Sequence, residues 1–380
     1  MAHSFFSETT YRDFSASVHD KAVARGLPVA GEIEVTRQCN LRCGHCYNGP
    51  PKKEREMTTD QIRRLLDAMA EAGCLWVLLT GGEPLLRSDF PQIYLYAKKK
   101  GFIVSLFTNA TLVTPQIADL LKEWPPFRVE VSLYGASRKV YEKVTGVAGC
   151  HAKCLKGIEM LRERNVSMEL KTLVTKDNKG EIAQIQRFAR ERGLHHRFDA
   201  YINPRLDGSR EPCRLRLTPE EVVALDLSSP ARCDTWRQIY KDAWGAKIDL
   251  DHVYACTSNQ WSFFVSAAGR MQACLMLPQP SCDVLRRPFL ASWRELVRAV
   301  QGLKPANPGH KCYHCEMSAL CYHCPAWAAL ENGDPESAVD FVCRSAHLRH
   351  HVFLEKGIIA KGGERYAEQD QANIPEADVV

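Results

Sequence analysis

Apolar, strand-like runs alternate with helical patterns from Gly31 to Tyr201, and this alternation constrains the fold more than any other feature of the chain. Six strand–helix units fit within about 170 residues. Consecutive units of this kind form right-handed crossovers and a parallel sheet. A closed eight-unit barrel usually needs roughly 250 residues. We therefore expect an α/β fold whose core is a partial (β/α)6 TIM-like barrel.

The expected elements follow from apolar runs, capping signals and glycines. A capping box, Thr58-Thr59-Asp60-Gln61, opens one helix, and Gly73 ends it. The expected strands cover residues 31–36, 74–80, 102–107, 127–133, 167–175 and 195–201, and the expected helices cover residues 59–72, 89–100, 115–122, 150–164 and 180–192. In such folds the functional loops lie at the C-terminal ends of the strands.

Five segments follow from composition. Residues 1–30 form a short N-terminal segment, too small to be a separate peptide-recognition domain, and residues 31–205 form the core. Residues 206–250 read as a helical linker, and residues 251–348 as a small cysteine-rich α+β domain. In that domain we expect a hairpin between residues 261–265 and 270–274. Residues 349–380 are polar, and we expect a disordered tail there.

Composition limits the class of protein. The chain has 380 residues, 45% of them hydrophobic, enough for a large core. No run is long enough to span a bilayer, and the N-terminus lacks the apolar stretch of a secretory signal. Sixteen cysteines without an export signal indicate metal ligands in the reducing cytoplasm rather than disulfides. The net charge of +5 is spread along the chain and does not form the basic cluster that indicates nucleic-acid binding.

Three cysteines, Cys39, Cys43 and Cys46, follow the first expected strand in a C-x-x-x-C-x-x-C spacing. Thiolates this close together suit an iron–sulfur cluster or zinc. A structural zinc site normally closes with four protein ligands, so a group of three argues against zinc. On a four-iron cluster, three thiolates would leave one iron free to bind a small molecule.

This spacing is the motif of the radical S-adenosylmethionine (SAM) enzymes, which the chain resembles. The resemblance implies a [4Fe–4S] cluster on the three cysteines, whose open iron chelates the amino and carboxylate groups of SAM. One electron then cleaves a C–S bond of SAM and releases a 5′-deoxyadenosyl radical. His45 stands before the third cysteine, where the family usually has an aromatic residue near the adenine.

A second motif, Gly81-Gly82-Glu83-Pro84, follows the second expected strand. Glycines lack a Cβ and let a ligand approach the backbone, although this motif alone could be an ordinary turn. One strand–helix unit after the cysteines, it looks like the family's GGEP motif, which holds the methionine ammonium of SAM.

Four further residues stand at later strand ends. Asn109 and Ser132 match positions that resemble SAM ribose and carboxylate contacts, and either could equally be a polar residue that caps a strand end. Lys171 and Asp199 would point from the last strands into the barrel. They are the candidate catalytic residues, and the alternative is a solvated or structurally paired side chain.

The C-terminal part carries a second cysteine pattern. Cys312-x-x-Cys315 and Cys321-x-x-Cys324 are separated by five residues, which is short for a zinc ribbon. A zinc site would also leave further cysteines without a role. The pattern comprises Cys256, Cys274, Cys312, Cys315, Cys321, Cys324 and Cys343.

This pattern resembles the SPASM extension of radical SAM peptide-modifying enzymes, which carries two auxiliary [4Fe–4S] clusters. The resemblance implies an outer cluster on Cys312, Cys315, Cys321 and Cys343, and an inner one on Cys256, Cys274 and Cys324. The Cys321–Cys324 gap is one residue shorter than usual, and the inner set has only three cysteines. Either Cys282, Cys233 or Cys213 completes it, or one iron is open. Cys74, Cys150 and Cys154 are expected to be small buried hydrophobes.

The resemblance implies an enzyme that oxidatively cross-links a ribosomally made precursor peptide. Its expected partners are that peptide, a reductant such as flavodoxin or ferredoxin, and a separate peptide-recognition protein. The alternatives are a sulfatase-maturing enzyme, a quinone-cofactor maturase, and a non-catalytic iron–sulfur or zinc protein. Sulfatase-maturing relatives place an aspartate base after the G-x-x-x-x-C cysteine, where this chain has Leu275.

Overall fold

A single sheet organises the molecule in the computed structural model, which describes residues 9–50, 54–244 and 249–360. Within these residues nine strands are ordered β6-β5-β4-β3-β2-β1-β7-β8-β9, and the sheet stays open between its edges, β6 and β9. The first six strands are parallel neighbours. They are β1 (Ala30–Thr36), β2 (Trp76–Gly81), β3 (Ile103–Thr108), β4 (Arg128–Ser132), β5 (Met168–Leu173) and β6 (His195–Asp199). The expected partial barrel is confirmed.

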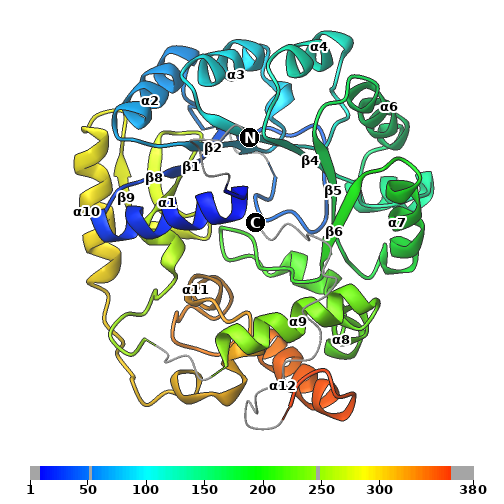
Figure 1. The fold of residues 1–380 in the computed structure, drawn as a ribbon, viewed down its shortest axis with the longest axis vertical. Helices are drawn as coiled ribbons and strands as arrows, with labels where there is room; N and C mark the ends of the chain where they lie inside the picture. Colours follow the sequence, from blue (N-terminus) through cyan, green and yellow to red (C-terminus); the bar gives the residue numbers. More distant parts are fainter. Residues whose placement is uncertain (1–8, 51–53, 245–248, 361–380) are drawn as a thin grey trace, which may run out of the picture.

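Helices cover the outer face of these strands in an arc (Figure 1). Five of them match expected helices: α2 (Thr59–Glu71), α3 (Phe90–Lys99), α4 (Pro115–Glu123), α6 (Cys150–Arg162) and α7 (Ile182–Arg190). The predicted capping box of Thr58 and Gln61 is present at the start of α2. A further helix, α5 (Arg138–Thr145), was not expected. No helix among the described residues is long and apolar enough to cross a membrane.

The two faces of the sheet differ in chemistry. On β1, Ile33 and Val35 point outward and are fully buried, whereas Glu32 and Glu34 point inward. A parallel sheet covered on both faces would have apolar runs instead of this alternation. The inner face therefore lines the open side of the half-barrel, and charged side chains there can meet a ligand.

The C-terminal strands extend the same sheet. As predicted, β7 (Ser262–Val265) and β8 (Arg270–Cys274) pair antiparallel. However, β7 also pairs parallel with β1, so the sheet continues across the expected domain boundary near residue 251. Strand β9 (Leu277–Asp283) then pairs with β8, and α10 (Phe289–Gln301) covers the outer face. The rings of Phe263 and Trp293 lie 6.1 Å apart between β7 and α10.

The N-terminal segment forms a helix, α1 (Tyr11–Arg25), that the sequence did not predict. Of its residues only Ala22 is buried, so it lacks the apolar stripe on which helix prediction depends. Aromatic contacts hold it in place: Trp76 Nε1 donates to the Tyr11 hydroxyl at 2.8 Å, and His19 stacks on Trp261.

Four C-terminal helices form a separate group at the open side of the half-barrel (Figure 1): α8 (Pro219–Asp226), α9 (Pro230–Ala243), α11 (Pro325–Asn332) and α12 (Asp340–Glu355). The expected disordered tail from residue 349 is wrong up to residue 360, because α12 continues to Glu355 and Phe353 is fully buried. Residues 361–380 lie outside the described residues. The apolar positions of α12 pack against α9 instead of forming a regular stripe of their own, which is why composition suggested a tail.

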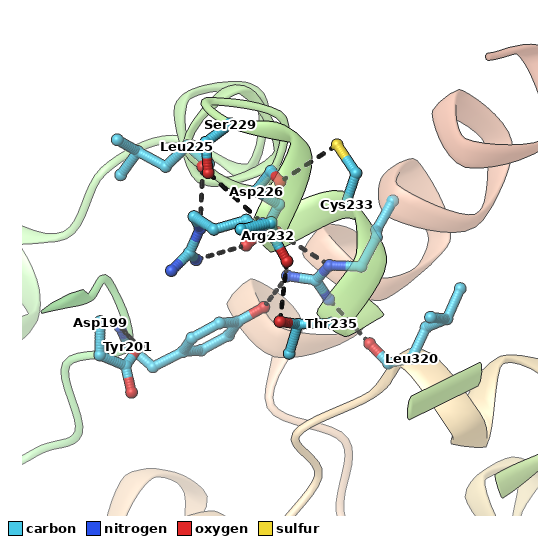
Figure 2. Close-up of polar contacts among 11 residues, drawn as sticks. Asp199, Tyr201, Leu225, Asp226, Ser229, Arg232, Cys233, Thr235 and Leu320 are labelled. Carbon is cyan, nitrogen blue, oxygen red and sulfur yellow. Dashed lines mark hydrogen bonds and ion pairs between the residues drawn. The ribbon is translucent and has the colours of Figure 1, made fainter. Parts of the chain in front are cut away.

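Arg349 on α12 anchors this group. Its side chain is fully buried and donates to Asp226 Oδ2 at 2.8 Å, to the Tyr201 hydroxyl at 2.7 Å and to the Leu320 carbonyl at 2.7 Å. Arg232 donates to the other carboxylate oxygen of Asp226 at 3.0 Å (Figure 2). One carboxylate thus ties α8, α9 and α12 to the end of β6.

Candidate active site

The cysteine loop leaves the C-terminal end of β1 and is fixed by α5. Arg42 N donates to Thr145 O at 2.8 Å, and Gly44 N donates to Val144 O at 3.3 Å. Burial raises the pKa of Cys43, and nearby charge on Cys46 and Cys39 raises it further. Burial also raises the pKa of Cys39, to about 11. The three thiols therefore share one protein-enclosed space.

The same three thiols do not form a site for a single ion. Across residues 9–50, 54–244 and 249–360, no three His, Cys, Asp or Glu side chains converge closely enough to hold one metal ion. In a four-iron cluster each thiolate binds a different iron, so the sulfur atoms stand farther apart than the ligands of zinc. Three soft thiolate ligands on one protein-enclosed loop fit a [4Fe–4S] cluster.

The two glycines of the GGEP motif lie directly against the start of the cysteine loop. A Cβ on Gly81 would lie 2.1 Å from Thr36 O, and a Cβ on Gly82 would lie 2.2 Å from Gln38 O. Gly81 also has a φ of 148°, which side-chain-bearing residues rarely adopt. The glycines are therefore required by close backbone packing between β2 and the cysteine loop, independently of any ligand.

Glu83 is fully buried, and protein donors surround its carboxylate. It accepts from Thr108 Oγ1 at 2.7 Å, from Asn109 N at 2.7 Å and from Leu85 N at 3.1 Å. Burial raises its pKa to about 7, and these hydrogen bonds lower it. Pro84 begins a short 3-10 turn, η1 (Pro84–Leu86), directly after it. Glu83 thus joins the ends of β2 and β3.

Asn109 extends this network to the cysteine loop. Its Nδ2 donates to Asn40 Oδ1 at 3.0 Å, and its Oδ1 accepts from the hydroxyl of Thr111 at 2.6 Å. Asn40 in turn donates to that hydroxyl at 2.8 Å. Sequence reasoning missed Asn40, although it lies within the cysteine motif. Asn109 is therefore a polar residue that positions the loop, and its amide reaches within 4.0 Å of Cys39 Sγ.

His45 and Ser132 both contact the side chain of Tyr134. The rings of His45 and Tyr134 lie edge to face, with centroids 4.6 Å apart. Burial lowers the pKa of His45 to about 4, so the ring is neutral at physiological pH, and its Nδ1 is buried without a hydrogen-bond partner. Burial raises the pKa of Tyr134, charge on Cys43 adds to the rise, and the Ser132 side chain opposes it.

The two candidate catalytic residues have different surroundings. Lys171 Nζ lies 3.6 Å from Glu130 Oε2 and 4.9 Å from the centroid of the Phe107 ring. This is the structurally paired arrangement that the sequence left as an alternative. Asp199 accepts a hydrogen bond from Tyr201 N at 2.9 Å, and burial raises its pKa. It lines a cavity of about 150 Å³ whose wall includes Arg232 (Figure 2).

The C-terminal cysteines form two groups. In the first, burial raises the pKa of Cys321 to about 11, and charge on Cys343, Cys315 and Cys312 adds to the rise. In the second, the surrounding protein raises the pKa of Cys274 to about 11, and charge on Cys324 and Cys256 adds to it. Each group contains cysteines that the family resemblance assigns to one auxiliary cluster, and the ligation itself stays a prediction.

Comparison with known proteins identifies the family. Residues 33–189 match the model of the radical SAM superfamily. The chain is 30% identical over 324 residues to the AdoMet-dependent heme synthase of Methanosarcina barkeri, which covers 79% of this chain and 92% of that protein. It belongs to the radical SAM superfamily.

Other similarities are shorter or more distant. The PqqA peptide cyclase of Rhodopseudomonas palustris is 31% identical over 156 residues, or 40% of this chain and 41% of the cyclase. The structure of Streptococcus suis SuiB bound to its precursor peptide SuiA superimposes with a TM-score of 0.64. It covers 90% of this chain and 84% of SuiB, at 15% identity, and so shows a shared fold.

The three proposed supplementary ligands of this radical SAM chain lie beside other partners. Cys282 is buried on β9 beside Arg287 and Glu295. Cys233 lies on α9, with its Sγ 4.0 Å from Asp226 O. Cys213 lies beside Arg216 and Glu331. Which of them completes the inner set, or whether one iron is open, stays a prediction. Cys74, Cys150 and Cys154 are buried, as predicted.

A cavity of about 160 Å³ lies at the C-terminal end of β1. Its lining includes Asn48, two residues beyond Cys46, and Leu275, next to Cys274. Its wall thus includes one residue that follows the cysteine loop of the radical SAM core and one that follows the inner cysteine Cys274. Glu34 lines the same cavity, and sequence reasoning missed it. The alternation of Glu32 and Glu34 with apolar residues in the first strand was the signal that could have found it.

Proposed function

We propose that this radical SAM enzyme oxidatively cross-links a ribosomally synthesised precursor peptide. The observation that carries the proposal is the presence of two separate cysteine groups beside the core triplet. Cross-linking by way of a carbon radical requires that an electron be removed afterwards. The inner and outer groups offer ligands for two auxiliary [4Fe–4S] clusters, whose potentials can be tuned over a wide range.

The chain's own residues have defined tasks in this proposal. Cys39, Cys43 and Cys46 would hold the core cluster, which together with SAM supplies a 5′-deoxyadenosyl radical that abstracts hydrogen. Gly81 and Gly82 let the end of β2 pack directly against the start of the cysteine loop, and Glu83 and Asn109 fix the position of that loop. Neutral His45 and Tyr134 form an aromatic wall against which an adenine could stack. A reductant such as flavodoxin or ferredoxin would deliver the electron.

The position of the cavity supports a peptide side chain as the reacting group. The cavity wall includes one residue that follows the core triplet and one that follows Cys274, and the cavity volume of about 160 Å³ suits a single side chain. SuiB, which shares the fold, was crystallised with its precursor peptide. A peptide segment at the open side of the half-barrel could place one side chain into this cavity.

An iron porphyrin is the second candidate substrate, because a heme synthase is similar over nearly its full length. A porphyrin with carboxylate side chains needs cations that are free to pair with it. The inner-face cations on β4, β5 and β6 are already paired. Lys171 faces Glu130 at 3.6 Å, and Arg128 donates to Glu169 at 2.9 Å. Arg197 Nε lies 2.9 Å from Glu169. This pairing favours the peptide.

Formylglycine formation has less support. The residue after Cys274 is Leu275, and its apolar side chain lines the cavity where sulfatase-maturing relatives would have an aspartate. The wall next to the inner cysteine group therefore offers no carboxylate base at that position.

One experiment separates the two substrate classes. The iron-loaded enzyme is incubated anaerobically with SAM, dithionite and either a peptide encoded beside the gene or Fe-coproporphyrin III. We expect the peptide to lose two hydrogens in mass and the porphyrin mass to stay unchanged. A change of the porphyrin together with no change of any neighbouring peptide would contradict the proposal.

A further inference from the structure

Glu34 projects from β1 into the cavity that Asn48 and Leu275 also line. Its side chain is only 3% exposed, and the cavity is its main opening. Oε2 accepts a hydrogen bond from Ala267 N at 3.0 Å. Oε1 lies 3.5 Å from Asn48 Nδ2 and 3.9 Å from Arg37 Nε. A carboxylate offers about four acceptor sites, so Glu34 retains acceptor capacity toward the cavity.

A second polar group in this cavity lacks a partner. The side-chain oxygen of Asn48 is buried and accepts no hydrogen bond. Buried polar atoms are usually paired, and an unpaired one at a cavity indicates a ligand that supplies the missing donor. Together, Asn48 and Glu34 present acceptors to whatever N–H, O–H or S–H group enters.

The charges around Glu34 come from several elements. Arg37 faces it and also pairs with Glu54 at 3.3 Å. Burial raises the pKa of Glu34; the Ala267 amide and Arg37 lower it, and Glu56 and Glu54 raise it. Tyr47 lies near enough for charge on Glu34 to raise its pKa. Arg37 lies 3.9 Å from the buried Glu34 carboxylate and is shared with Glu54, so its stabilisation of the charged form is weak. Such a carboxylate is suited to accept a proton.

We propose that Glu34 is the general base of the cross-linking step, an inference that rests on the proposed peptide substrate. The radical carbon of the substrate forms a C–X bond with atom X of a second peptide side chain, where X initially carries a hydrogen. The X–H bond breaks, its proton moves to a carboxylate oxygen of Glu34, and one electron leaves to a one-electron oxidant of the iron–sulfur class. Atoms and charge then balance.

The opposite wall of the cavity supports this assignment. Leu275 occupies the place beside Cys274 where a related enzyme class carries its aspartate base, and it cannot accept a proton. Glu34 reaches the same cavity from β1. The carboxylate that lines this cavity is thus supplied by β1 and not by the residue after Cys274.

The test compares Glu34→Gln with Glu32→Gln, a control on the same face of β1 that does not line the cavity. With SAM, dithionite and a deuterated peptide encoded beside the gene, E34Q should still transfer deuterium to 5′-deoxyadenosine within about twofold of wild type. Formation of the peptide lighter by two hydrogens should fall by about 100-fold or more, as for loss of a general base. E32Q should match wild type, and Glu34→Asp should recover part of the rate.

An independent readout uses the iron-free protein. The infrared difference between wild type and E34Q should show a protonated carboxyl band that persists above pH ~5, beyond the usual glutamate range. Wild-type cross-linking rates in E34Q, or a loss of deuterium transfer in E34Q as large as the loss of cross-linking, would overturn the base role alone. Failure of the wild-type enzyme to modify any neighbouring peptide would overturn the proposed function as well.

Discussion

The carboxylate of Glu83 accepts a hydrogen bond of 2.7 Å from the backbone N–H of Asn109, and thereby ties the end of β2 to the end of β3. Asn109 continues the link to Asn40 within the cysteine motif. The motif that resembles a SAM-binding signature is therefore also a structural junction. Its residues set the position of the cysteine loop before any cofactor binds.

The buried position of Glu83 predicts a pH dependence of stability. Burial raises its pKa from 4.5 to about 7, so between these values the folded state holds a proton that the unfolded state has lost. The contribution of Glu83 to stability should therefore fall as pH rises through this window. We expect the free energy of unfolding of wild type minus that of Glu83→Gln to decrease from pH ~5 to ~7. Denaturant titration of the iron-free proteins measures it, and a constant difference would refute the burial effect.

Gly82 should not tolerate a side chain. A Cβ at this position would lie 2.2 Å from Gln38 O and 2.6 Å from Gln38 C, which are backbone atoms and cannot turn away. Gly82→Ala should cost roughly 1–3 kcal/mol, as overpacking does, and displace the loop that carries Cys39. Gly180→Ala is the matched control, because a Cβ there meets no atom within 4 Å. Equal stability and equal SAM cleavage in the two variants would contradict this reading.

The cysteine groups predict iron content. Cys274 shares a group with Cys324 and Cys256, whereas Cys282 lies beside Arg287 and Glu295. Cys274→Ala should lose about four iron atoms per chain, the content of one [4Fe–4S] cluster. Cys282→Ala should retain the wild-type iron and sulfide. Iron analysis after anaerobic reconstitution measures both, and iron loss in Cys282→Ala would place that thiol among the ligands.

The sequence predicted those parts of the fold that depend on patterns among residues close together in the chain. The six strands of the core follow from apolar runs, and the cysteine groups follow from spacing. The joining of β7 to β1 was not predictable, because it pairs residues far apart in sequence, such as Ala30 with Ser262. Likewise, α1 carries almost no buried residues, and its place depends on aromatic contacts with distant strands. Glu34 was missed because its cavity is formed by four separate segments.

The buried Arg349–Asp226 pair predicts a large effect on stability. The side chain of Arg349 is fully buried and that of Asp226 is 5% exposed. Removing Arg349 leaves the buried Asp226 carboxylate paired with Arg232 alone and leaves the Leu320 carbonyl without this donor. Breaking a buried pair in this way typically costs about 3–5 kcal/mol. Arg349→Ala should lose that amount, whereas Arg344→Ala on the same helix should change stability by less than about 1 kcal/mol, because its pair with Asp340 is exposed. Denaturation of the iron-free variants tests this, and similar losses in both would contradict it.

The central claim is that the 5′-deoxyadenosyl radical formed by this chain acts on a peptide and that the peptide is then oxidised. The most direct measurement is the mass spectrum of a deuterated peptide encoded beside the gene, after anaerobic incubation with the iron-loaded enzyme, SAM and dithionite. We predict a peptide that has lost one deuterium and one further hydrogen, and 5′-deoxyadenosine that carries that deuterium. Cleavage of SAM with neither peptide oxidation nor deuterium transfer, for every neighbouring peptide, would contradict the claim.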